Sequence, residues 1–104
     1  MNQPEKEQMY IITVSCYKCE KDINIAVMYS NTTMRGPELF SLEEIKIAKE
    51  QDVKIMEQYS YTMGTTYQAN TCAQCNAFVG QHFLPEYLSD ALYGDYEYKK
   101  IDIV

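Results

Sequence analysis

The sequence predicts an α+β fold: a small antiparallel sheet with two short helices, in one domain spanning residues 1–104. Strand-like runs are joined by short turns, and no regular alternation of strands with crossover helices appears, which favours antiparallel pairing. The four cysteines fall into two Cys-x-x-Cys pairs, Cys16–Cys19 and Cys72–Cys75. A chain of 104 residues is close to the common size of a single domain.

The first Cys pair is predicted to lie at the tip of a β-hairpin. Residues 9–15 form a strand-like run that leads into Cys16, and residues 23–29 form its partner. In the second run Ile23 and Ile25 alternate with polar or small residues, which is the period of a half-buried strand.

A helix is predicted over residues 42–51, after a loop at 31–37. Ser41 and Glu44 have the spacing of a capping box, in which each side chain bonds the backbone amide of the other residue. The apolar residues at helical spacing, expected to face the sheet, are Leu42, Ile45 and Ala48.

The second half of the chain repeats the pattern of strands leading to a Cys pair. Residues 53–61 and 66–71 are the expected third and fourth strands, joined by a turn at 63–65, and the fourth enters Cys72. A second helix is expected over residues 85–93, followed by a last strand over 96–104. The leucines on one face of this helix are Leu84, Leu88 and Leu92.

Two Cys-x-x-Cys pairs with no cysteine left over are typical of a tetrahedral Zn²⁺ site. Iron in a rubredoxin-like site would use the same ligands. Disulfides would require an oxidising compartment, and the first residues lack a basic segment followed by an apolar run, so a cytoplasmic location is expected. A thioredoxin-like site is disfavoured, because Cys19 is followed by charged residues and a strand rather than by a helix.

The charge of the chain restricts its partners. Nine basic and fifteen acidic residues give a formal net charge of -6, and Arg35 is the single arginine. Binding to a phosphate backbone depends on Lys and Arg, so direct nucleic-acid binding is disfavoured. No apolar run approaches the roughly 18 residues of a membrane span, and no membrane association is expected.

Tyrosine is unusually frequent, with ten residues and no Trp. Tyr suits a half-buried strand, which would explain the excess by packing alone. It is also enriched at protein interfaces. On that second interpretation the expected partner-binding residues, on strands leading to the second Cys pair, are Tyr59, Tyr61 and Tyr67.

The segment from Thr62 to Leu84 resembles a zinc-ribbon module of bacterial and phage proteins. In that module a Gly turn and a Tyr-x-Ala-Asn strand precede Cys-x-x-Cys, and Gly-x-x-Phe-Leu follows; the chain has all three. The resemblance implies a zinc-ribbon-like fold, a bacterial, phage or mobile-element origin, and no established reaction. It also implies that the metal ligands are Cys16, Cys19, Cys72 and Cys75. The module prefers Gly after its last ligand, where this chain has Asn76, and Glu20 departs further at the matching place in the first pair.

No catalytic role is predicted. Four cysteine ligands leave no open position for water, and His82, the only histidine, has no recognisable nucleophile or acid partner. We therefore expect a non-enzymatic zinc-binding module that interacts with a protein partner. One alternative is an acidic inhibitor that mimics nucleic acid in the groove of a host enzyme, and a further alternative is a nucleic-acid-binding zinc ribbon.

Overall fold

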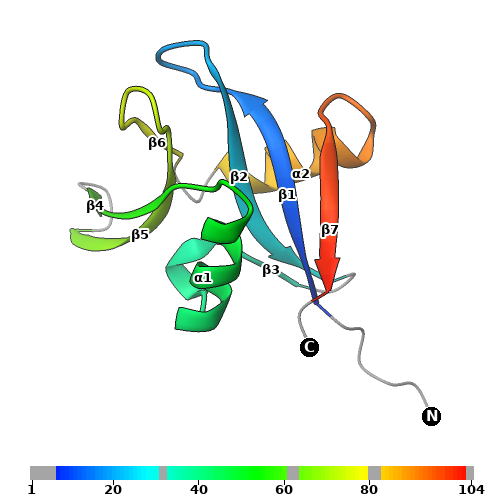
Figure 1. The fold of residues 1–104 in the computed structure, drawn as a ribbon, viewed down its shortest axis with the longest axis horizontal. Coiled ribbons are helices and arrows are strands. Elements are labelled where there is room, and N and C mark those ends of the chain that lie inside the picture. The colour runs from blue at the N-terminus through cyan, green and yellow to red at the C-terminus, as the bar shows by residue number, and fades with distance from the viewer. Residues whose placement is uncertain (1–6, 31–32, 61–63, 80–82, 103–104) are drawn as a thin grey trace.

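The computed structural model describes residues 7–30, 33–60, 64–79 and 83–102, which form two antiparallel sheets and two short α-helices (Figure 1). The first sheet has the strand order β3 (Met34–Arg35), β2 (Asp22–Tyr29), β1 (Gln8–Ser15) and β7 (Tyr98–Asp102). The second has the order β4 (Ile55–Ser60), β5 (Thr65–Thr71) and β6 (Phe78–Val79). The helices are η1 (Pro37–Leu39), a 3₁₀ turn, and α1 (Leu42–Glu50) and α2 (Leu84–Leu92). The predicted α+β class is confirmed, but its strands are divided between two sheets rather than gathered in one.

The predicted hairpin of β1 and β2 is confirmed. The two strands pair in continuous register from Gln8 opposite Tyr29 to Ser15 opposite Asp22, so residues 16–21, with both cysteines, form the connection at its tip. Strand β7 then pairs antiparallel with the other edge of β1. The two-residue strands β3 and β6 were not predicted, because runs this short carry no measurable period.

The two helices cover opposite faces of the first sheet, which corrects the expectation that both pack on one face. Leu84, Leu88 and Ala91 of α2 join the core on one side. Ala48 of α1, with the half-buried Ile45, joins the core on the other side. Strand β1 is apolar on both faces in its first half, as strands covered on both sides are, so each face requires its own cover.

Two leucines predicted to pack inward do not. Leu42 is 88% exposed, and Leu92 is 45% exposed. Side chains of a helix lean toward its N-terminus, so Leu42, the first helical residue, projects past the part of α1 that contacts the sheet. Leu92 is the last residue of α2 and lies at the border of a groove described below.

The ends of α1 follow from local sequence. The predicted capping box is present: the Ser41 hydroxyl accepts a hydrogen bond from the Glu44 amide at 3.1 Å, and the Glu44 carboxylate accepts one from the Ser41 amide at 2.8 Å. At the other end the amides of Asp52 and Val53 bond back to carbonyls of the last turn, with Asp52 at a φ of 63°. This is a Schellman arrangement in which Asp occupies the left-handed position usually held by Gly.

The second sheet is attached along the outer edge of β2, beside the first sheet in Figure 1. Asn24 of β2 forms a parallel bridge with Val53, just before β4. Ala26, two residues after Asn24 on β2, is bound by the side chain of Asn70 on β5. This side chain accepts a hydrogen bond from the Ala26 amide at 2.9 Å and donates one to the Ala26 carbonyl at 3.1 Å. The side-chain amide of Asn70 thus replaces a neighbouring strand, and it is fully buried. Beyond it, β3 pairs with the end of β2.

Candidate metal centre

The first Cys pair is held in a tight turn by the hairpin. The Cys16 amide donates to the Lys21 carbonyl at 2.8 Å, and the Glu20 amide donates to the Cys16 carbonyl at 2.9 Å. Inside this turn the Lys18 amide points at the Cys16 sulfur, 3.4 Å away. Closing the turn places Glu20 at a φ of 65°, the conformation that the zinc-ribbon resemblance assigns to Gly.

The second Cys pair has the same turn, residue for residue. The Cys72 amide donates to the Ala77 carbonyl at 2.7 Å, and the Asn76 amide donates to the Cys72 carbonyl at 3.0 Å. The Gln74 amide points at the Cys72 sulfur at 3.4 Å, and Asn76 has a φ of 63°. We call these two turns the knuckles: residues 16–21 and residues 72–77. Their equivalence is not visible in the sequence beyond Cys-x-x-Cys, because backbone amides form it.

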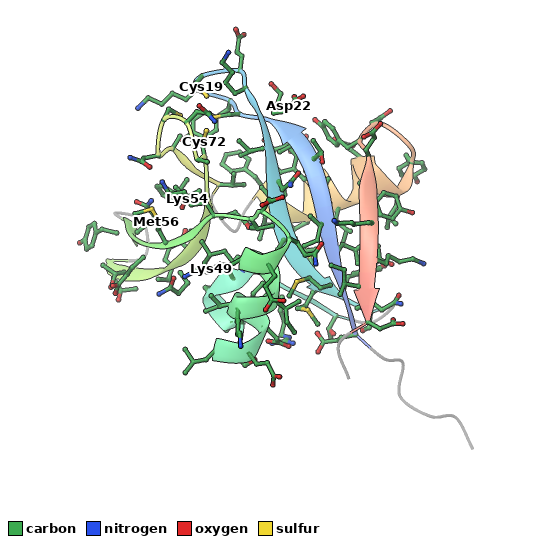
Figure 2. The ribbon with its side chains drawn as sticks, viewed as in Figure 1. Cys19, Asp22, Lys49, Lys54, Met56 and Cys72 are labelled. Atoms are coloured by element: carbon green, nitrogen blue, oxygen red, sulfur yellow. The ribbon has the colours of Figure 1, made fainter. Side chains whose placement is uncertain are left out.

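The tips of the two sheets bring the knuckles together, and Figure 2 shows Cys19 and Cys72 at the same end of the molecule. Cys16 and Cys75 lie 3.6 Å apart between sulfurs, and Cys19 and Cys72 lie 3.5 Å apart. All four sulfurs lie within 4.8 Å of one another. Zn–S bonds of about 2.3 Å in a tetrahedron require sulfurs about 3.8 Å apart, so this group could hold a metal ion of that kind.

The environment of the thiols favours the thiolate at two of the cysteines and opposes it at a third. Backbone amides of Cys19 and Lys18 lower the pKa of Cys16 to about 6, although burial opposes them. The pKa of Cys72 is also lowered, because the amides of Cys75 and Gln74 outweigh its burial. The amide of Lys21 favours the Cys19 thiolate, but burial and the three neighbouring thiols raise the pKa of Cys19 to about 12. Without a bound cation Cys19 therefore keeps its proton at neutral pH, and a positive ion would favour its release.

The group is partly enclosed. Cys16 and Cys72 are buried, whereas Cys19 and Cys75 are partly exposed, and no disulfide joins them. Across the described part of the chain, these four are the only group of His, Cys, Asp and Glu side chains gathered at metal-binding distance. The predicted ligand set is therefore assembled as expected. His82 lies outside the described residues.

Of the three tyrosines proposed to bind a partner, the two that the structure describes, Tyr59 and Tyr67, do not share one surface. Tyr59 pairs with Thr66 and Tyr67 pairs with Gln58. Paired residues on adjacent strands point to the same face of a sheet, and successive residues along one strand point to opposite faces. Tyr59 therefore shares a face with Thr66, and Tyr67, the next residue, points to the other face of the second sheet. Tyr59 is 50% exposed, while the ring of Tyr67 packs edge-on against Phe78. Tyr61 lies outside the described residues, and the binding role of these residues stays a prediction.

Comparisons of the chain with protein-family models, with curated proteins and with solved structures found no match. The resemblance to zinc ribbons therefore depends on the knuckles themselves. Within the described ranges, no helix is long and apolar enough to cross a membrane.

Proposed function

We propose that this protein is a non-enzymatic zinc-binding module that acts by binding a protein partner. The observation that supports it best is the convergence of four thiols from two equivalent knuckles within 4.8 Å. Thiolates favour Zn²⁺, and a shell of four cysteines is the usual composition of a structural site.

The position of the site gives the metal a structural role. It joins the tip of the first sheet to the tip of the second, through cysteines separated by 53 and 59 residues in the chain. Without metal, the knuckles would depend on core packing alone to stay together, at an entropic cost that grows with loop length. Binding of zinc therefore contributes to folding directly.

The same composition argues against catalysis. A hydrolytic zinc centre has three protein ligands and an open position for water, whereas the four thiols gathered here would fill all four positions around a bound ion. We expect no metal-dependent hydrolase activity. A zinc-dependent turnover abolished by His82→Ala would contradict this.

Elemental analysis of the purified protein, with a Cys72→Ser variant, tests the metal site. We expect one zinc per chain in the natural protein, and loss of zinc in Cys72→Ser with broadened amide NMR signals from both knuckles. Ala73→Ser is the matched control, because it alters an exposed residue of the same knuckle and should retain zinc. A protein without metal, or a Cys72→Ser variant of unchanged metal content and thermal stability, would refute the proposal. Iron instead of zinc would be evident from its colour.

A further inference from the structure

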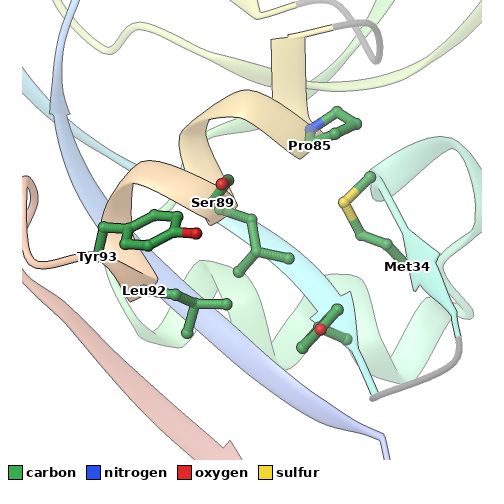
Figure 3. A pocket seen from close by; sticks show the side chains of 7 residues that line it. Met34, Pro85, Ser89, Leu92 and Tyr93 are labelled. Atoms are coloured by element: carbon green, nitrogen blue, oxygen red, sulfur yellow. The ribbon is translucent and has the colours of Figure 1, made fainter.

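A groove of about 490 Å³ lies between α2 and the end of the first sheet, away from the knuckles. Figure 3 shows Pro85, Ser89, Leu92 and Tyr93 on the helix side and Met34 opposite them. This volume is within the range of specific binding pockets. None of the described residues that line it is charged.

One wall is a continuous face of α2. The residues that line the groove recur at helical spacing over about 12 Å, from Pro85 through Leu88 and Ser89 to Leu92 and Tyr93. Leu88 is buried, whereas Leu92 is 45% and Tyr93 is 85% exposed. The apolar stripe of α2 is therefore wider than the sheet can cover, and the groove is where it remains uncovered.

The opposite wall combines a fixed ring and an adaptable side chain. The Tyr29 ring packs edge-on against Tyr10, with centroids 5.6 Å apart, and Tyr10 in turn stacks on Tyr98. Met34 on β3 completes the wall with a flexible thioether, the kind of side chain that adjusts to an incoming apolar surface.

The charges near the groove are mostly acidic. Helix α2 carries Glu86 and Asp90 and no basic residue. The carboxylate of Glu38 lies near the side chain of Leu84, the first residue of α2, because both side chains come close to Gly36.

The nearby bases do not offset these acids. Arg35, next to Met34 in the chain, is held by Glu7 at 2.9 Å and by Glu44 at 2.9 Å. Lys100 lies on β7 opposite Tyr10 of β1, with that strand between it and Tyr29, and is a single base against Glu38, Glu86 and Asp90.

We propose that this groove binds an amphipathic, basic helix of a partner protein. Apolar side chains of that helix, spaced at i, i+3, i+4 and i+7, would fill the groove, and its Lys or Arg residues would face the acidic side chains of α2. The inference names the partner class for the interaction role proposed above and rests on it.

The test uses the full-length, zinc-loaded protein and fluorescently labelled synthetic helices. The probe peptide has Leu at the four anchor spacings and Lys elsewhere; a scrambled peptide of identical composition and a Glu-for-Lys peptide are its controls. We expect the probe to bind at least about tenfold more tightly than either control. Equal binding of the scrambled peptide would overturn the proposal, because it would show attraction by charge alone.

Leu92→Asp should weaken probe binding by about tenfold or more. The matched control is Leu42→Asp on α1, which adds the same charge at another exposed leucine and should leave affinity within about twofold. The added carboxylate alone would strengthen attraction to a basic peptide. A lower affinity of Leu92→Asp for the probe would therefore show that apolar contacts in the groove contribute to binding. Tyr93→Ser, at a residue 85% exposed, gives a second variant should Leu92→Asp not fold.

Unchanged affinity in both groove variants, or no binding of the probe, would refute the inference. Zinc content, measured on the same samples, separates this result from the proposed function. If the protein contains zinc but does not bind the probe, only the proposed helix binding at the groove is refuted. If the protein contains no metal, the proposed zinc-binding module is refuted.

Discussion

Asn70 joins the second sheet to the first, and its replacement by Ala measures the contribution of that junction. The side chain makes two hydrogen bonds to the backbone of Ala26, and both residues are fully buried. Asn70→Ala removes both bonds and leaves an amide and a carbonyl of β2 without partners where water has little access.

The expected loss is large for a single polar residue. A buried backbone group left without a partner costs about 1–3 kcal/mol, and two of them with a small cavity give about 3–4 kcal/mol. A domain of this size is stable by only about 5–15 kcal/mol. The melting temperature should therefore fall by roughly 15 °C.

Urea unfolding of the zinc-loaded protein, combined with hydrogen exchange at the Ala26 amide, is the suitable assay. Asn70→Ala should lower the free energy of unfolding and accelerate exchange at Ala26. Thr66→Ala is the control on the same strand, because its hydroxyl bonds Glu57 at an exposed position and should cost less than about 0.5 kcal/mol. A loss below about 1 kcal/mol for Asn70→Ala, with unchanged exchange at Ala26, would refute the reasoning.

Asn70→Asp adds a pH readout. The introduced carboxyl would be buried beside the Ala26 carbonyl, so its pKa in the folded protein should rise above its unfolded value. Protonated, it can donate to that carbonyl as Asn70 does; ionised, it cannot. The loss in free energy of unfolding relative to the natural protein should therefore be smallest below the pKa of the unfolded state and grow as pH rises through the pKa of the folded state. A deficit independent of pH would show that the carboxyl is solvated.

Three further predictions concern local features. Asp52→Gly should raise the free energy of unfolding by about 0.5–1 kcal/mol, because Gly adopts the φ of 63° without strain; calorimetry showing a loss would mean that the Asp side chain stabilises the turn. Glu44→Gln retains the capping box but loses the ion pair with Arg35, and should cost about 1 kcal/mol at neutral pH. Burial opposes ionisation of Glu44, but hydrogen bonds from Arg35 and Ser41 lower its pKa overall. The stabilisation by Glu44 is therefore present above the pKa of the unfolded state and is lost as pH falls through the pKa of the folded state. A stability difference between Glu44→Gln and the natural protein that persists in acid would contradict the assignment. Tyr59→Ala should weaken capture of an identified partner by about 1–2 kcal/mol while zinc content is unchanged, and loss of folding instead would show that this ring is structural.

The sequence by itself determined the features that depend on neighbouring residues. A strand-like run predicted β1 and alternating apolar residues predicted β2. The Ser41–Glu44 spacing predicted the start of α1, because hydrogen bonds within one turn define a cap. The four cysteines were identifiable as one ligand group, because Cys-x-x-Cys spacing alone allows both sulfurs of a knuckle to face one ion.

Tertiary structure decided how these pieces are divided and joined. The apolar run of β1 requires a cover on each face, but only the tertiary structure shows which helix covers which face, and that Leu42 projects into solvent. Asn70 is an ordinary strand residue in the sequence; only the approach of β5 to the edge of β2 makes its side chain part of the sheet. The groove beside α2 also depends on tertiary structure. Whether Leu92 is covered depends on where strands far away in the sequence end, and the residues around Leu92 do not determine that.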